Sequence, residues 1–334
     1  MAPKRGKDTL PAVKLRVLVT GASGFVGAAL CRELLARGHA VRAAVRRLTA
    51  PPGTAPEAAQ VLVPDIAGEF DRRALLEGVD TVVHLAALAH RAAGEIETRR
   101  VNFEGTARLA DAAAGLVRRF VFMSSVKVQG DDSRDRAYVE TDSLRPEDAY
   151  GRSKLEAERS LTELSSRRGM QVALIRPPLV YGPGVKANFL RLLAWVDSGL
   201  PLPFASVRNR RSLIYLGNLV DAVVRCVEHQ AAQGAFLVSD EEVVSTAELV
   251  QHTARALERQ ARLLRVPLGI LRLAGAIAGR SDEIHRLTGN LVADASKARR
   301  VLEWRPPFTL DEGLAETARW FKSTSGPARA ARQL

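Results

Sequence analysis

The feature that most constrains this chain is a short apolar run that ends in a glycine-rich turn. Residues 15–20 have the sequence LRVLVT, a run rich in valine and leucine that is typical of a buried parallel strand. Residues 25–37 then have helical periodicity, and Gly38 stops the helix at a C-cap position. A strand, a glycine-rich turn and a helix in this order predict the first unit of an α/β fold.

The turn, TGASGFVG at residues 20–27, indicates a phosphate-binding loop. Gly21 allows a tight turn, Gly24 lets the backbone approach a pyrophosphate, and Gly27 permits close packing of the helix on the strand. The free N–H groups and the dipole of the helix N-terminus favour an anion there. A purely structural turn is the alternative. The residues of this turn that we predict to bind a dinucleotide are Gly21, Ser23, Gly24, Phe25, Val26 and Gly27.

Strand and helix patterns alternate along the following 150 or so residues. Further strands are predicted at residues 40–45, 61–63, 81–85, 120–123 and 172–175, and helices at 71–77, 95–115 and 147–168. Strands that alternate with helices of ten or more residues indicate right-handed βαβ units and a parallel sheet covered on both faces. The predicted fold class is therefore α/β, a doubly wound parallel sheet of the Rossmann type.

The pattern becomes less regular after residue 176, where several prolines follow. We expect a flexible basic tail at residues 1–14, a dinucleotide-binding Rossmann domain at 15–176 and a smaller C-terminal substrate-binding lobe at 177–325. Elements of this lobe, such as residues 236–238, are expected to return to the main sheet.

The longest apolar stretch, residues 266–279, is interrupted by Arg272 and is too short to span a bilayer. A buried helix is the favoured interpretation, with a contact on one membrane face as the alternative. No transmembrane segment is predicted. Cys31 and Cys226 are the only cysteines, which predicts neither a disulfide framework nor a metal site and fits a reducing cytoplasm.

The formal net charge of +12 raises the question of a nucleic-acid partner. Only eight of the 49 basic residues are lysines, and the arginines are scattered along the chain. Aromatic residues do not alternate with them, as a platform for single-stranded nucleic acid requires. The charge therefore favours an anionic small-molecule substrate over a nucleic acid.

Three residues carry the predicted chemistry. Tyr150 and Lys154 lie four apart at the start of a predicted helix and share one helical face. An ammonium group lowers the pKa of a nearby phenol, so Tyr150 is predicted to act as a general acid and base near neutral pH. Ser125 lies at the carboxyl edge of the predicted sheet, where ligands bind. Taken singly, an exposed Tyr–Lys pair and a turn-forming serine are the alternatives.

Together these segments resemble the extended short-chain dehydrogenase/reductase family, in particular its nucleotide-sugar epimerase and reductase group, over nearly the whole chain. The separation of 25 residues between Ser125 and Tyr150 matches the family's Ser…Tyr-x-x-x-Lys triad. The resemblance implies that Ser125, Tyr150 and Lys154 are catalytic, and that the last two also contact the cofactor. The other cofactor-binding residues that it implies are Asp65 and Ile66 at the adenine, Leu85, Ala86 and Ala87 after His84, Asn102, and Pro177 beside the nicotinamide.

The resemblance also extends to the substrate side and the C-terminus. Asn188 corresponds to an asparagine that contacts the phosphates of a sugar nucleotide, and Arg211 to an arginine that pairs with its diphosphate. Residues 294–299 and Trp304 resemble a C-terminal signature of the family, with Glu303 in place of its glycine. Family members are commonly homodimers, which implies a contact through the helices at 95–115 and 147–168.

The end of the second strand bears on the cofactor. Family members that select NAD usually have an aspartate at the position of Val45, whereas an uncharged residue followed by Arg46 suits a 2′-phosphate. NADP(H) is therefore favoured, with NAD(H) as the alternative. In an arginine-rich chain, Arg46 could also simply end the strand.

The residues after Ser125 bear on the reaction. Sugar dehydratases of the group have Asp-Glu there, whereas this chain has Val126 and Lys127, so dehydration is disfavoured. The segments most resemble a bacterial surface-polysaccharide subgroup, which implies hydride transfer at C4 of a UDP-hexose, foremost reduction of a UDP-4-keto-6-deoxy-N-acetylhexosamine. The alternatives are a UDP-glucose or UDP-N-acetylglucosamine 4-epimerase with retained NAD, a reductase of non-sugar ketones, and a non-catalytic NADP-sensing regulator. Lys127 is interpreted either as substrate-facing or as solvated.

Overall fold

A seven-stranded parallel sheet forms the centre of the protein. The computed structural model describes residues 14–48, 58–88 and 94–330. In the order in which they lie in the sheet, the strands are β3 (Ala59–Leu62), β2 (Ala40–Val45), β1 (Arg16–Thr20), β4 (Thr81–His84), β5 (Arg119–Met123), β6 (Gln171–Arg176) and β9 (Gly234–Leu237). The chain winds outward from β1 in one direction and then from β4 in the other. Ligands bind at the carboxyl edge of such a sheet, near this change of direction.

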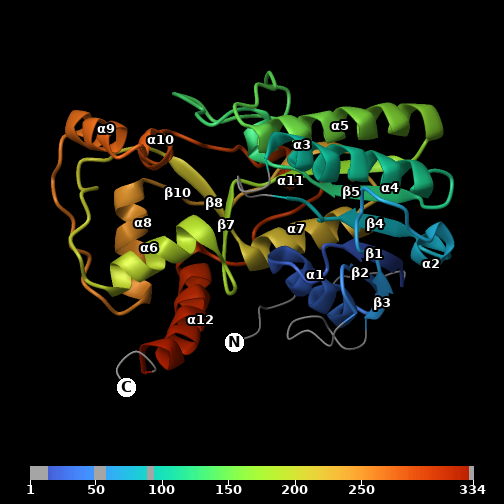
Figure 1. The fold of residues 1–334 in the computed structure, drawn as a ribbon, viewed down its shortest axis with the longest axis horizontal. Coiled ribbons are helices and arrows are strands. Elements are labelled where there is room, and N and C mark those ends of the chain that lie inside the picture. The colour runs from blue at the N-terminus through green and yellow to red at the C-terminus, as the bar shows by residue number, and fades with distance from the viewer. Residues whose placement is uncertain (1–13, 49–57, 89–93, 331–334) are drawn as a thin grey trace.

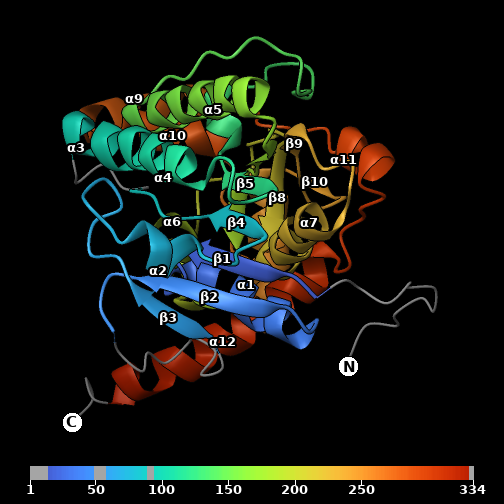
Figure 2. The same ribbon diagram turned by 90° about the vertical axis from the view of Figure 1, so that its right-hand side faces the viewer.

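Alternating side chains of the strands build two cores, one on each face of the sheet. Val17 and Val19 of β1 belong to one core and Leu18 to the other. Helices α1 (Phe25–Ala36) and α7 (Leu216–Glu228) cover the first face; α2 (Arg72–Leu76), α4 (Gly105–Ala113) and α5 (Ala149–Arg168) cover the second. Figure 2 shows α4 and α5 on the opposite side of the sheet from α1. This is the predicted doubly wound α/β fold.

Most predicted elements differ from the structure by one or two residues at their ends, and two of the differences have a clear physical reason. The third strand is Ala59–Leu62 rather than 61–63. It lies at the edge of the sheet and none of its residues is fully buried, so the apolar run in the sequence does not coincide with the bounds of the strand. The single helix predicted at 95–115 is α3 (Glu95–Arg99), a π-helix at Arg100–Glu104, and α4. Hydrophobic periodicity does not detect the added residue of a π turn, and such turns are frequent at functional sites.

Most of the remaining elements form a lobe beside the sheet, on the left in Figure 1, whereas α11 (Ser296–Val301) packs against β9. Its small sheet has the order β10 (Val243–Val244), β8 (Arg211–Tyr215) and β7 (Leu179–Tyr181). The remaining helices are α6 (Ala187–Asp197), α8 (Thr246–Ala256), α9 (Leu268–Ile277), α10 (Ser281–Thr288), α11 (Ser296–Val301) and α12 (Leu310–Ala330).

The expectation that the apolar stretch 266–279 is a buried helix is wrong. Within α9 only Leu271 and Gly275 are buried, whereas Leu273 and Ile277 are 63% and 80% exposed. The helix lies at the edge of the lobe and one side of it lacks a covering element (Figure 1). Its apolar composition therefore does not reflect a place in the core. None of the described helices has the length and apolar character needed to cross a membrane.

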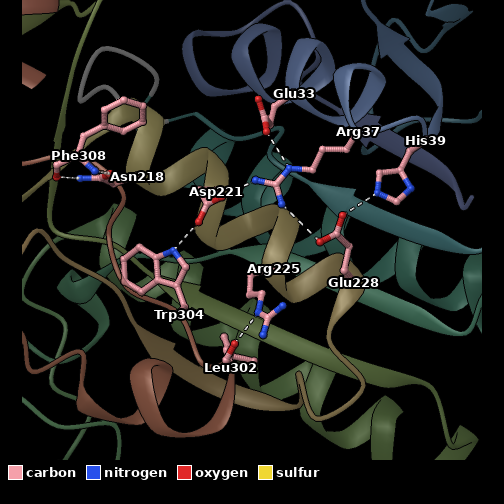
Figure 3. Close-up of polar contacts among 10 residues, drawn as sticks. All are labelled: Glu33, Arg37, His39, Asn218, Asp221, Arg225, Glu228, Leu302, Trp304 and Phe308. Atoms are coloured by element: carbon pink, nitrogen blue, oxygen red, sulfur yellow. Dashed lines mark hydrogen bonds and ion pairs between the residues drawn. The ribbon is translucent and has the colours of Figure 1, made fainter. Parts of the chain in front are cut away.

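A cluster of charged groups joins α1, α7 and the C-terminal segment (Figure 3). Arg37, which follows α1, forms ion pairs with Glu33, with Asp221 and with Glu228. The carboxylate of Asp221 also accepts a hydrogen bond from Nε1 of the buried Trp304, at 3.0 Å. Asp221 therefore links Arg37, at the end of α1, to Trp304, which lies 83 residues after Asp221 in the chain.

We expect Asp221→Ala to lower the free energy of unfolding by about 2 kcal/mol, because it leaves the half-buried Arg37 and the Trp304 indole without a shared acceptor. Urea denaturation measures this change. The control is Glu77→Ala, which removes the exposed partner of Arg73 and should cost less than about 0.5 kcal/mol. Equal losses in the two variants would contradict this role of Asp221.

Candidate active site

The glycine-rich turn packs directly against the loop that follows β4. Gly21 has φ +67°, and a Cβ on it would lie 2.9 Å from the backbone nitrogen of Ala86. A Cβ on Gly27 would lie 2.1 Å from the carbonyl oxygen of Gly21, which accepts the N–H of Gly24 at 2.9 Å. The two glycines are therefore required by close backbone contacts, as the sequence predicted.

The N-terminus of α1 is open to an anion. Gly24 occupies the N-cap position in an extended conformation, and no side chain caps the helix. Ser23 and Gly24 are exposed, and Phe25 and Val26 are half-buried. Backbone N–H groups that no side chain caps, at the carboxyl edge of a parallel sheet, fit the pyrophosphate of a dinucleotide.

Thr20, at the end of β1, fixes the loop after β4. Its Oγ1 accepts hydrogen bonds from the backbone N–H groups of Leu85 and Ala86, both at 3.2 Å. The same hydroxyl lies 2.7 Å from Nδ1 of His84. With both acceptor sites used by backbone groups, Thr20 donates its one proton to His84. Leu85 and Ala86, two of the predicted cofactor-binding residues, thereby lie beside the glycine-rich turn, with the half-buried Ala87 following them.

His84 is fully buried, and burial lowers its pKa to about 3, so the ring is neutral. Its Nδ1 accepts from Thr20, and its Nε2 therefore donates to Oγ1 of Thr106, at 3.0 Å. Thr106 in turn donates to the carbonyl oxygen of Asn102, at 2.6 Å. This chain of bonds connects β1, β4 and the π-helix. From the sequence, His84 was expected only as part of a family segment, and no pattern pointed to Thr20 or Thr106 as its partners.

Asn102, within the π-helix, joins the loop after β4 to α5. Its Oδ1 accepts the N–H of Leu88 at 2.7 Å and its Nδ2 donates to the Leu88 carbonyl at 3.0 Å. Nδ2 also donates to Oγ of Ser153, which donates to the carbonyl oxygen of Tyr150 at 2.8 Å. Asn102 is completely buried, so these bonds satisfy its amide and hold α5 against the loop after β4.

Ser125 follows the carboxyl end of β5 and caps the 3-10 turn Val126–Val128, accepting the N–H of Lys127 at 3.2 Å. The N–H of Val126 donates to the carbonyl of the buried Pro177, at 3.0 Å, so the segments after β5 and β6 are joined here. In the described part of the chain, the buried Oγ of Ser124 has no hydrogen-bond partner. Such an atom at a strand's carboxyl end fits a site that a ligand completes.

Tyr150 and Lys154 lie in the first turns of α5. A Cβ on the neighbouring Gly151 would lie 2.9 Å from the carbonyl of Lys127, so this end of α5 rests on the turn that Ser125 begins. Nζ of Lys154 lies 5.9 Å from the centre of the Tyr150 ring and donates to the carbonyl of Met123, at 2.8 Å. The structure thus brings the predicted triad to the carboxyl end of β5.

The electrostatics of this pair differ from the expectation. Burial, and then the charge of Asp148, raise the pKa of Tyr150 to about 12, whereas a lowered value was predicted. Burial lowers the pKa of Lys154 to about 7, so near neutral pH its charge is only partly present. Spacing along a helix indicates that two groups are neighbours, but burial decides how strongly they are charged.

A third charged group, Lys127, lies next to this pair. Its ammonium forms an ion pair with Asp131 at 3.2 Å and another with Asp148, which also caps α5 by accepting the N–H of Gly151 at 2.7 Å. The side chain is 23% exposed, so it is neither fully solvated nor free to leave the site. Lys127 therefore partly offsets the carboxylate that raises the pKa of Tyr150.

The predicted adenosine-side residues lie at the carboxyl ends of the outer strands. Arg46, just after β2, is exposed and has no ion pair within the described residues. Asp65 pairs with Arg100 at 2.7 Å, and this bond lowers the pKa of the carboxylate. Ile66 is buried, and a Cβ on Gly105 would lie 2.9 Å from its Cγ2.

The two predicted substrate residues lie in the lobe. Asn188, in the first turn of α6, is exposed and accepts a hydrogen bond from Arg191 at 2.6 Å. Arg211, at the start of β8, donates through Nη1 to the carbonyls of Arg286 and Gly289, the latter at 3.1 Å. Burial lowers the pKa of Arg211. Its guanidinium thus already holds the end of α10.

Known proteins resemble this chain over most of its length. Residues 17–239 match the model of the NAD dependent epimerase/dehydratase family. A UDP-glucose 4-epimerase of Vibrio cholerae is 42% identical over 315 residues, which cover 91% of this chain and 95% of the relative. A 3-beta-hydroxysteroid dehydrogenase of Mycolicibacterium neoaurum is 30% identical over 341 residues, which cover 93% of this chain and 92% of the relative.

Among solved structures, MoeE5 in complex with UDP-glucose and NAD is similar with a TM-score of 0.75 and 28% sequence identity, covering 93% of this chain and 99% of that one. The family model, the relatives and the fold agree with the family resemblance found in the sequence. This chain therefore belongs to the NAD-dependent epimerase/dehydratase family, within the extended short-chain dehydrogenases/reductases.

Proposed function

We propose that this enzyme is a UDP-hexose 4-epimerase that uses NAD. The observation that carries the proposal is the 42% identity to a UDP-glucose 4-epimerase over 91% of the chain, in a protein whose Ser125, Tyr150 and Lys154 meet at one strand end. This was the alternative in the sequence analysis. The C4 reduction placed first there is not supported by the relatives to the same degree.

The described residues fit a bound dinucleotide. The uncapped N-terminus of α1 and the glycines at 21, 24 and 27 would hold the pyrophosphate, Asp65 and Ile66 the adenosine, and Lys154 and Pro177 the nicotinamide end. NAD held by these residues would supply the acceptor, and then the donor, of a hydride at C4 of the sugar. A 4-keto sugar that rotates in the site between the two transfers would receive the hydride on its opposite face.

Tyr150 would move the proton of the sugar O4. With a pKa of about 12 its phenol is protonated near neutral pH, which suits donation of a proton to the oxygen of a 4-keto group. The opposite step requires the phenolate, which the ammonium of Lys154, 5.9 Å from the ring centre, stabilises when it is charged. The Ser125 hydroxyl would hydrogen-bond the same oxygen and stabilise charge that develops on it.

Arg211 and Asn188 would bind the diphosphate of the substrate. The bonds of Arg211 to the α10 end use Nη1, and within the described part of the chain the N–H groups of Nε and Nη2 remain for phosphate oxygens. Asn188 is exposed at the first turn of α6. Binding the remote diphosphate would position the sugar C4 for reaction.

One observation favours a second function, reduction of a 4-keto sugar by NADPH. β2 ends in Val45, without the carboxylate that commonly holds the adenosine ribose, and the exposed Arg46 and Arg47 follow. A guanidinium there suits a 2′-phosphate. The two functions differ in whether the cofactor stays bound between turnovers.

A homodimer is also part of the proposal. Helices α3, α4 and α5 pack together on one side of the sheet (Figure 2), and Ile96 of α3 is 87% exposed. This is the surface through which the family resemblance implies a contact between two copies.

Denaturing the purified protein and identifying the released nucleotide by chromatography separates the two functions. We expect about one NAD per chain, because an epimerase regenerates its cofactor within each turnover. A purified protein that releases no nucleotide, and that binds NADPH much more tightly than NADH, would contradict the epimerase function and support the reductase function. In that case Arg46→Ala should abolish the preference for NADPH.

Tyr150→Phe should lower kcat for C4 epimerisation by about 10²–10⁴-fold, since the proton of O4 then has no carrier. Binding of the dinucleotide, followed by fluorescence titration, should stay within about twofold of wild type, because the ring remains in place. A variant that keeps wild-type turnover would exclude Tyr150 from proton transfer.

The pH dependence of kcat should change when Lys127 is replaced. Lys127→Met leaves the charge of Asp148 unscreened, which raises the pKa of Tyr150 further and should move the phenolate-dependent limb of kcat to higher pH, by on the order of one unit. Asp148→Asn keeps a good N-cap for α5 but removes the charge, so the limb should move to lower pH. Lys127→Arg is the matched control and should change little; a shift equal to that of Lys127→Met would contradict the charge effect.

A further inference from the structure

Helix α9 exposes an apolar face that no described element covers. Ile270, Leu273 and Ile277 follow one another at spacings of three and four residues and so lie on one side of the helix. Their side chains are 57%, 63% and 80% exposed. We call these three residues the α9 face. An ordered row of large aliphatic side chains in water, unlike a single exposed leucine, indicates a contact surface.

The other side of α9 attaches it to the lobe. Leu271 and Gly275 are buried, and a Cβ on Gly275 would lie 2.5 Å from Cγ1 of Ile284 in α10. The helix is therefore held in a defined orientation that keeps the α9 face outward. In Figure 1, α9 lies at the outer end of the lobe, away from the parallel sheet.

Positive charge predominates in this helix and in the loop before it, although Glu258 precedes the segment and Asp282 and Glu283 follow it. Residues 259–280 contain five arginines and no aspartate or glutamate. Arg259 pairs with Asp197, whereas the other four are exposed and form no ion pair within the described part of the chain. These four, Arg262, Arg265, Arg272 and Arg280, are here called the α9 arginines. The surface that complements them carries negative charge, and guanidinium groups suit phosphate in particular.

An apolar helix face, in a segment whose exposed arginines form no ion pair with the described side chains, matches an anionic phospholipid surface. The aliphatic groups enter the boundary between headgroups and acyl chains while the arginines bind lipid phosphates. A helix of ten residues is about 15 Å long and lies along a bilayer rather than across it. A second copy of this chain fits less well, because a two-fold interface would bring the α9 arginines of both copies together.

We propose that the α9 face and the α9 arginines dock this protein on anionic phospholipid membranes, with α9 lying in the plane of the surface. The inference is independent of the proposed reaction. It places the lobe, rather than the parallel sheet, against the bilayer. Helix α10 directly follows α9, and its end is the group that Arg211 holds. Docking would therefore bring the substrate side of the enzyme close to the membrane.

Flotation of the full-length protein with vesicles tests this directly. One set of vesicles is pure phosphatidylcholine and the other contains about a third phosphatidylglycerol. We expect the protein to float with the anionic vesicles, at least tenfold more than with the neutral ones, and to be released by 0.5 M salt. No flotation with anionic vesicles would overturn the proposal.

Two variants separate the contributions. The triple variant Ile270→Ser, Leu273→Ser and Ile277→Ser, and the double variant Arg265→Gln and Arg272→Gln, should each reduce flotation at least tenfold. The matched control is Leu116→Ser with Arg118→Gln, which changes one exposed leucine and one exposed arginine near α4 and should float like wild type. Circular dichroism melts verify that all three variants are folded.

The remaining outcomes would also overturn the proposal. If the triple variant still floats, or if the control loses flotation equally, binding does not depend on α9. If wild type does not float and the triple variant alone changes the mass measured by light scattering, the α9 face is a contact between copies of the chain.

Discussion

A buried chain of hydrogen bonds from Thr20 through His84 to Thr106 holds the site together. Burial keeps the His84 ring neutral, so each ring nitrogen has one fixed role, and every hydroxyl in the chain is both donor and acceptor. The chain fixes the loop after β4 against Gly21, where close backbone contact leaves no room for a side chain. Displacing any member would leave a buried polar group unpaired, which is costly.

The π-helix extends this constraint to α5. Asn102 satisfies both backbone groups of Leu88 and, through Ser153, the carbonyl of Tyr150. The loop after β4 and Tyr150, the proposed proton carrier, are therefore positioned by one buried amide. Around Tyr150 and Lys154, in contrast, charge and burial oppose each other: burial weakens the charge of Lys154, and Asp148 opposes the phenolate while Lys127 partly offsets Asp148.

The interactions that position residues in the lobe differ from those in the parallel sheet. Its residues are positioned by backbone carbonyls and by contacts distant in sequence, such as the bonds between Arg211 and the end of α10. The exposed α9 face has no local signature that separates it from a core helix, since both are apolar. Composition alone therefore suggested burial. Only the tertiary structure, which places α9 at the outer end of the lobe (Figure 1), leaves the α9 face exposed.

The sequence by itself determined the parallel sheet, the glycine-rich turn and the triad, because these depend on local periodicity, on glycine geometry and on residue spacing. The position of β3, the π turn at Asn102 and the partners of His84 needed the tertiary structure, because edge burial and hydrogen bonds between distant segments leave no local pattern. The same holds for the protonation of Tyr150 and Lys154. Spacing makes them neighbours, but the dielectric environment and the charges of Asp148 and Lys127, which the fold alone brings together, decide their pKa values.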